Sequence, residues 1–170
     1  VDARDGSLVA VGGRGTVARS SDGGAHWQIL SGNLWTSRFN ALAATPDGQR
    51  LFAAGTGGML LRSDDRGQSW HLLQEDLKAY VNELLPGVRP GELWVSGPDG
   101  YLARSADAGR HWATVKTGLP SEVALLALVR APHSGALMAA GPMATFLRSR
   151  DEGTHWQITQ PVGDAGEGYF

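Results

Sequence analysis

Short apolar runs of four to six residues alternate along this chain with turns rich in glycine, serine and aspartate. Runs of this length, bounded by glycine, are typical of β-strands joined in hairpins. The pattern occurs four times. Segments of thirteen residues that begin with Leu and end with Arg-Ser lie at 8–20, 51–63, 93–105 and 137–149. Each segment holds two apolar runs around a turn and therefore predicts a β-hairpin.

The turn of each hairpin begins with glycine, at Gly12, Gly55, Gly97 and Gly141. In the first three turns another glycine follows three residues later, at a position where glycine allows a positive φ angle. The fourth turn has Ala144 at this position. We therefore predict that the fourth hairpin turns differently from the others.

Each unit is predicted to contain four strands. Further apolar runs start at Phe39, Val81 and Val123, before three of the hairpins, and a last strand is expected to start at the Trp that follows each hairpin. Residues 77–84 also show apolar positions at helical spacing, but their alignment with 39–45 favours a strand. A short helical turn over 75–78 is compatible with this interpretation.

A motif of the form Ser-x-Asp-x-Gly-x-x-Trp follows every hairpin. Its members are Ser20, Asp22, Gly24, Trp27; Ser63, Asp65, Gly67, Trp70; Ser105, Asp107, Gly109, Trp112; and Ser149, Asp151, Gly153, Trp156. An aspartate in such a turn accepts hydrogen bonds from backbone amides, and the Trp can bury a large apolar face between neighbouring units. Because a catalytic constellation is normally unique in a chain, four copies of the motif predict a structural role.

These four segments resemble the Asp box, or BNR repeat, of β-propellers such as sialidases, sortilin-type receptors and photosystem II assembly-factor-like proteins. The longer pattern at 10–27 and 53–70 is most similar to the last group, whose relatives also occur in non-photosynthetic bacteria. The resemblance implies an all-β fold, a β-propeller of four-stranded antiparallel blades. In these families the Asp boxes lie between the third and fourth strands, away from the functional face. The resemblance also favours a periplasmic or secreted location.

The Trp residues of the motif are separated by 43, 42 and 44 residues, a period in the range of propeller blades. We place the blade repeats at 1–34, 35–77, 78–119 and 120–163, with 164–170 as the start of an inner strand. Tyr169 and Phe170 would then complete the first blade, either of this chain or of another copy, and help to close the ring. Families with Asp boxes usually have six or more blades. The chain is therefore expected to be part of a seven- or eight-bladed ring, or a half-ring that pairs into eight.

Composition excludes several classes of function. A net charge of −2 provides no overall field for nucleic acid, and the absence of cysteine rules out disulfides and thiolate zinc sites. No apolar run approaches the roughly 20 residues that span a bilayer, so no membrane insertion is expected. The chain starts with Val1 rather than Met, which we interpret as a processed product or a piece of something longer.

A sialidase would need an arginine cluster, a Tyr nucleophile beside a Glu, and an acid-base Asp. The arginines at the end of each hairpin recur at one blade position, so we expect each to pack on a Trp or pair with an acid: Arg19, Arg62, Arg104 and Arg148. Tyr80 and Glu83 are three residues apart, which places them on opposite faces of a strand. The histidines before three of the motif Trp residues lie in different units, too far apart to share a metal: His26, His111 and His155. We therefore predict no catalytic residue, cofactor or metal.

Residues that do not recur are the better functional candidates. The candidate interaction residues are Trp35, Tyr80, Glu83 and Arg89. Trp94 also breaks the repeat, and a core position is the alternative for both Trp35 and Trp94. Asn40 and Asn82 fall on inner-strand segments that could line a channel. The sequence thus predicts a non-catalytic scaffold for protein-protein interaction, whose partner is another protein, a second copy or missing blades. The alternative is a glycan-handling propeller, either sialidase-like or sugar-binding.

Overall fold

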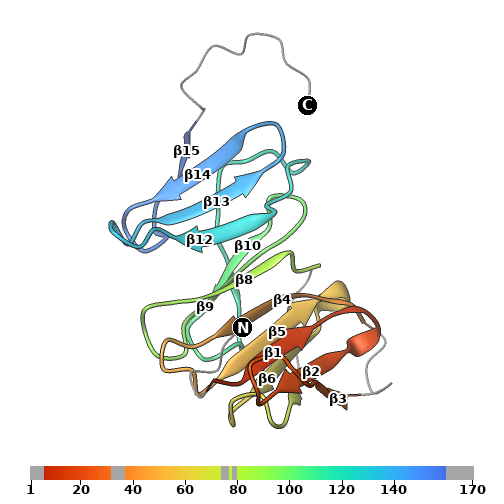
Figure 1. The fold of residues 1–170 in the computed structure, drawn as a ribbon. Coiled ribbons are helices and arrows are strands. Elements are labelled where there is room, and N and C mark those ends of the chain that lie inside the picture. The colour runs from red at the N-terminus through yellow and green to blue at the C-terminus, as the bar shows by residue number, and fades with distance from the viewer. Residues whose placement is uncertain (1–5, 32–36, 74–76, 78–79, 160–170) are drawn as a thin grey trace.

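The computed structural model describes residues 6–31, 37–73, 77 and 80–159. Its strands form four separate antiparallel sheets, which follow one another along the chain (Figure 1). We call them blades 1 to 4. Blade 1 holds β1 (Leu8–Val11), β2 (Val17–Ser20) and β3 (Gln28–Ser31). Blade 2 holds β4 (Phe39–Ala44), β5 (Leu51–Gly55), β6 (Leu60–Ser63) and β7 (His71–Leu73). Blade 3 holds β8 (Glu83–Pro86), β9 (Leu93–Ser96), β10 (Leu102–Ser105) and β11 (Ala113–Thr114). Blade 4 holds β12 (Ala127–Arg130), β13 (Leu137–Gly141), β14 (Thr145–Ser149) and β15 (Gln157–Thr159).

The all-β prediction is confirmed. In blades 2 to 4 the four strands lie side by side in chain order, whereas the described residues of blade 1 form three. Each outermost strand starts one residue after its motif Trp, not at the Trp itself. Most of the helical turn suggested for 75–78, and all of the inner-strand start at 164–170, lie outside the described residues.

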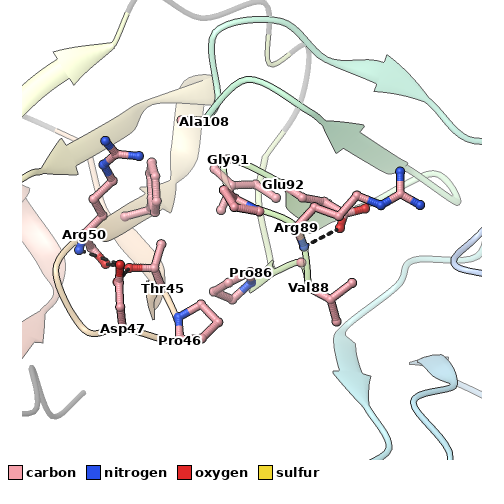
Figure 2. A pocket seen from close by; sticks show the side chains of 14 residues that line it. Thr45, Pro46, Asp47, Arg50, Pro86, Val88, Arg89, Gly91, Glu92 and Ala108 are labelled. Atoms are coloured by element: carbon pink, nitrogen blue, oxygen red, sulfur yellow. Dashed lines mark hydrogen bonds between the residues drawn. The ribbon is translucent and has the colours of Figure 1, made fainter.

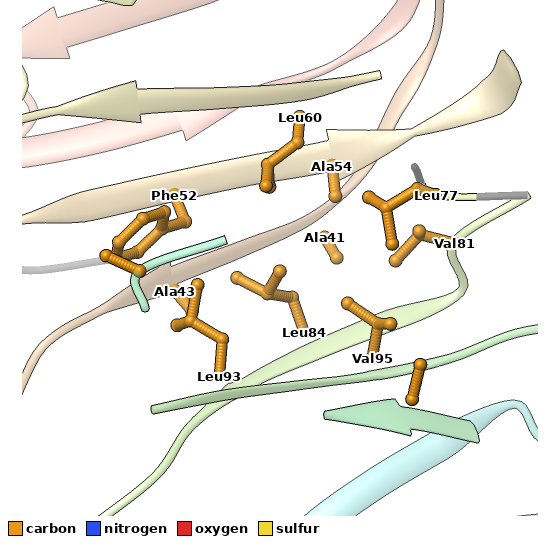
Figure 3. Packing of buried hydrophobic residues seen from close by; sticks show 12 residues of the cluster. Ala41, Ala43, Phe52, Ala54, Leu60, Leu77, Val81, Leu84, Leu93 and Val95 are labelled. Carbon is orange, nitrogen blue, oxygen red and sulfur yellow. The ribbon is translucent and has the colours of Figure 1, made fainter. Parts of the chain in front are cut away.

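Side chains that alternate along each strand point to the two faces of a blade, and a face is buried where a neighbouring blade covers it. Leu51 and Ala53 of β5 pack toward blade 1, while Phe52 and Ala54 pack toward blade 3. Figure 3 shows the second of these layers, where blade 2 meets apolar side chains such as Leu93 of blade 3. A third layer of the same kind lies between blades 3 and 4. Since each large aliphatic side chain buried there contributes roughly 1.5–3 kcal/mol, the layers between blades are the hydrophobic core.

Hydrogen bonds between the inner strands join the blades as well. At each boundary a backbone amide of one blade donates to the first turn glycine of the preceding hairpin: Phe39 N to Gly12 O at 3.0 Å, Val81 N to Gly55 O at 3.1 Å, and Leu125 N to Gly97 O at 2.8 Å. The side-chain amides of Asn40 and Asn82 donate to Val81 O and Leu125 O of the next blade, at 3.1 and 3.0 Å. These two asparagines therefore bridge neighbouring inner strands.

The Asp-box turns of blades 2 to 4 each pack against the blade before them. A Cβ atom added at Gly67 would lie 2.7 Å from Cγ2 of Val9, and one at Gly109 would lie 2.7 Å from Cδ2 of Leu60. At Gly153 a Cβ would overlap the ring of Trp94. Glycine is thus required by the close approach of two blades, in addition to the positive φ angle at these positions.

The prediction for the fourth hairpin is wrong. Ala144 has a φ of 55° and the preceding Met143 a φ of 53°, close to the values of 55° and 64° at Asp99 and Gly100 in the third hairpin. Both turns close with the same bond, from Tyr101 N to Pro98 O and from Thr145 N to Pro142 O. The short span between paired strands imposes the left-handed conformation even on alanine.

Ala144→Gly should therefore stabilise the protein. Relief of the left-handed strain outweighs the greater chain entropy of glycine in the unfolded state, so we expect the free energy of unfolding to rise by about 0.5–1 kcal/mol. Urea denaturation measures it. The reverse change, Gly100→Ala in the equivalent turn, should lower the free energy by a similar amount. An unchanged or lower free energy of unfolding for Ala144→Gly would contradict the prediction that Ala144 is strained.

Gly153→Ala should cost more than the backbone strain alone. Gly135 offers a matched control, because it also has a positive φ but no atom lies within 4 Å of its added Cβ. Both substitutions carry left-handed strain of about 1–2 kcal/mol, whereas only the methyl group at 153 collides with Trp94. We expect Gly153→Ala to lower the free energy of unfolding by about 1–3 kcal/mol more than Gly135→Ala in parallel urea titrations. Equal losses would show that the two blades do not touch closely here.

Candidate functional site

The four Asp boxes share one hydrogen-bonded geometry. In every copy the Ser hydroxyl donates to Oδ1 of the Asp at 2.8 to 2.9 Å and accepts from the Gly amide at 2.8 to 2.9 Å. The indole Nε1 of the Trp donates to the Gly carbonyl at 3.0 to 3.2 Å. The Ser, Asp and Trp polar atoms are thus engaged within the turn itself.

The residue before the Trp completes the turn, which the sequence analysis did not anticipate. Its amide donates to Oδ1 of the Asp, and its side chain bonds Oδ2 at 2.6 to 2.7 Å. The side chain is Nδ1 of a histidine in three blades and the hydroxyl of Ser69 in blade 2. The sequence did contain a signal for this role: the position holds His in three motifs and Ser in the other, and both side chains can donate a hydrogen bond to a carboxylate.

These bonds hold the aspartates in their charged form. The amide of His26, then its ring and the hydroxyl of Ser20, lower the pKa of Asp22 to about 2. The equivalent bonds from His111 and His155 also lower the pKa values of Asp107 and Asp151. A general acid near neutral pH needs the opposite shift. The Asp-box carboxylates therefore suit turn formation and not proton transfer.

A pocket of about 220 Å³ lies between the turn that joins β4 to β5 and the turn that joins β8 to β9 (Figure 2). We call it the proline pocket, after the apolar residues that form much of its wall: Pro46, Pro86, Val88 and Pro90. A shallower groove of about 520 Å³ lies next to it along blade 3, with Arg104, His111 and Trp112 in its lining. Arg89 lines both hollows.

Most charges around the proline pocket are neutralised. Buried Glu92 accepts from the Arg89 amide at 3.3 Å and pairs through Oε1 with Nη2 of Arg104 at 2.7 Å. The guanidinium of Arg104 also stacks over the Trp94 ring, 5.4 Å from its centroid. Arg50 pairs with Asp64 at 2.9 Å. The guanidinium of Arg89, by contrast, has no ion-pair partner among the residues that the structure describes.

The predicted interaction residues do not gather at one place. Trp35 lies outside the described residues. Tyr80 is exposed before β8, and Glu83 begins that strand, where burial raises the pKa of its carboxyl. Arg89 follows the other end of β8, at the proline pocket. The pocket-lining prolines were missed, although a Pro in each of the turns at 45–50, 87–92 and 131–136 was a visible signal.

Trp94 is a core residue, fully buried and 6.3 Å from the ring of Trp156 in an edge-to-face arrangement.

The recurring arginines follow the expected pattern only in part. Arg104 packs on a Trp and pairs with an acid, and Arg62 pairs with Asp64 at 2.6 Å. Arg19 instead donates to the carbonyl of Arg66 in blade 2. Residues at one blade position thus find different partners.

Comparison with known proteins agrees with this geometry. The BNR/Asp-box repeat model matches residues 61–72, which span the Ser, Asp and Trp of the second motif. The chain therefore contains a BNR/Asp-box repeat within an all-β fold of successive blades. No curated protein sequence matches it. YCF48 bound to D1 peptide is a similar structure, with 23% identity and a TM-score of 0.69, covering 88% of this chain and 50% of that one.

Two other solved structures share the propeller fold. YCF48 from Cyanidioschyzon merolae has 17% identity and a TM-score of 0.69, covering 94% of this chain and 53% of that one. An ancestral GH74 enzyme has 18% identity and a TM-score of 0.74, covering 97% of this chain and 24% of that one. The chain thus spans about half the length of the YCF48 structures and a quarter of the enzyme. At these identities the likeness establishes the fold alone.

Among the described residues, no three His, Asp or Glu side chains gather as ligands for a metal ion. The same part of the chain contains no helix of the length and apolarity that would cross a membrane. The proline pocket, which Arg89 lines, is a candidate binding site on the geometry given above.

The pKa of Asp22 should be measurably dependent on His26. Because His26→Ala removes the ring bond but keeps the amide bond, which is the larger cause, we expect the pKa to rise from about 2 yet stay below 3.8. Carbon-detected NMR titration of the carboxyl measures it, and His71→Ala, at an exposed strand position, is the control. Since the folded-state pKa is the lower one, the stabilisation by this carboxylate is complete above pH 3.8 and is lost as pH falls through 2. An unshifted pKa in the His26 variant would refute the role of the ring.

Proposed function

We propose that this BNR propeller is a non-catalytic platform that binds another protein at the proline pocket. The observation that carries the proposal is an apolar pocket bordered by Arg89, whose guanidinium has no acidic partner among the described residues. Arginine beside an apolar pocket is a common arrangement at the energetic centre of protein interfaces. A volume of about 220 Å³ is small for a cofactor or sugar site but accommodates one or two side chains of a peptide.

The chemistry of the pocket indicates what kind of segment it binds. Pro46, Pro86 and Val88 offer apolar contacts, while Arg89 offers a charge-assisted hydrogen bond at the rim. An extended segment with an apolar side chain next to an acidic one would satisfy both. The structure of YCF48 with a bound D1 peptide supports the proposal, since a propeller of this fold accepts a peptide ligand.

Glycan handling is the second candidate, favoured by the GH74 likeness and by Glu83. Burial raises the pKa of the Glu83 carboxyl, which is the shift that a general acid needs. A glycosidase also needs a second carboxylate about 5–9.5 Å away. The aspartates of the Asp boxes are engaged in turns, and Asp64, Glu92 and Glu152 pair with arginines. Glu83 therefore has few described candidates for its partner, and we favour binding.

Selection from a displayed library of random ten-residue peptides tests the proposal. We expect enrichment of peptides in which an apolar residue neighbours an acidic one. Arg89→Ala should weaken a selected peptide at least about tenfold, because it removes the charge-assisted bond, and Val88→Asp should abolish binding by placing a carboxylate in the apolar wall. Fluorescence anisotropy with the labelled peptide measures both.

Arg150→Ala is the matched control, because Arg150 is an exposed arginine in the Asp box of blade 4. It should leave peptide binding unchanged. The proposal fails if the library yields no binder, or if the Arg89 and Arg150 variants bind equally well. Turnover of a fluorogenic sialoside or of a β-glucan, lost in Glu83→Gln, would replace it with the glycan-handling alternative.

A further inference from the structure

The face of blade 4 that points away from blade 3 is uncovered at positions that are buried in every other blade. Phe52 and Trp94 are at most 1% exposed, whereas Met138, at the same place in its hairpin, is 38% exposed. Leu60 and Leu102 are fully buried, whereas the equivalent Phe146 is also 38% exposed. Val129, the cross-strand neighbour of Met138, adds a third exposed apolar side chain. We call this the blade 4 end face.

The opposite end of the chain shows the complementary pattern. On the face of blade 1 that points away from blade 2, Ala10 is exposed, whereas its equivalent Ala53 is fully buried. Trp27 is 46% exposed, and the motif Trp residues of the other blades are half-buried against the preceding blade. We call this face, with Ala10, Ala18, Gly24 and Trp27, the blade 1 end face. The described residues place no other blade against this face.

One hydrogen bond shows what a following blade can supply at this surface. Arg19 on blade 1 donates through Nε to the carbonyl of Arg66, in the Asp-box turn of blade 2. Arg148 holds the equivalent position on blade 4, and its Nε is buried without a hydrogen-bond partner among the described residues, as is the Nε of Arg104 on blade 3. The pairing therefore rests on the exposed apolar residues and not on this arginine.

The two end faces are the two halves of one boundary. At each of the three boundaries within the chain, one face of a blade packs on the Asp-box turn and the facing apolar side chains of the next blade, as Phe52 and Leu60 do on Leu93. At the two end faces, the large residues are Met138 and Phe146, and Ala10 and Ala18 are small residues that could receive them. Packed layers fill space when a large side chain on one layer lies opposite a small side chain on the other. In Figure 1, blades 1 and 4 stand at opposite ends of the molecule, so the two faces do not meet within one chain.

We propose that the blade 4 end face binds the blade 1 end face of a second copy of this chain. Two such contacts, related by a twofold axis, would close two chains into a ring of eight blades, within the range known for propellers. Gly24 would then receive the close approach that Gly67, Gly109 and Gly153 receive inside the chain, and Trp27 would become covered. The pairing is independent of the peptide-binding proposal, because the proline pocket lies between blades 2 and 3.

Sedimentation equilibrium of the protein and three lysine variants tests the pairing. The unchanged protein should have twice the chain mass of 18.0 kDa. Phe146→Lys on one end face and Ala10→Lys on the other should each reduce the mass to one chain, because a buried unpaired charge opposes association. Leu72→Lys is the matched control, since Leu72 is 51% exposed on an outer strand of blade 2, and it should remain paired.

Mixing the Phe146 and Ala10 variants provides a second readout. The mixture contains one unaltered pair of end faces, so it should reach a higher average mass than either variant alone. Near-UV circular dichroism checks that each variant is folded. The proposal is overturned by a single-chain mass for the unchanged protein, by masses above two chains, or by an Ala10 variant that stays paired, which would indicate contact between two blade 4 faces.

Discussion

Close contact between the Asp-box turn of one blade and the sheet of the blade before it is the constraint on which this structure depends. A single four-stranded sheet cannot bury both of its faces, so each blade is stable only between neighbours. The glycine of the Asp box permits this contact, because a Cβ at Gly153 would overlap Trp94. The hydrophobic layers and the inner-strand hydrogen bonds occur at the same boundaries.

The Asp box itself is a self-contained turn. Its carboxylate accepts from the Ser hydroxyl, from an amide and from the His or Ser side chain before the Trp, so it needs no partner from another blade. An Asp held in this way has a low pKa and has little to offer as a proton donor. The proposed binding site uses turns whose residues differ between blades: at the proline pocket Glu92 and Asp64 pair with two arginines, whereas Arg89 has no ion-pair partner among the described residues.

Tryptophans of this chain show how position in the series of blades decides the fate of one residue type. Trp94 is fully buried because blade 4 covers it, whereas Trp27, on the first blade, is almost half exposed. The surface left at the two ends is thus made of residues that elsewhere form the core.

The sequence by itself determined the repeat, the blades and the role of the turn glycines, because Ser, Asp, Gly and Trp recur at a fixed spacing and each has a local physical reason to do so. It did not determine that Ala144 adopts a left-handed conformation, that Trp94 is core, or that Arg89 has no acidic partner among the residues that the structure describes. Each of these depends on atoms far away in the chain: the paired strand that closes a turn, the next blade that covers a ring, and the carboxylates that other arginines have already engaged. Only the tertiary structure brings those atoms together.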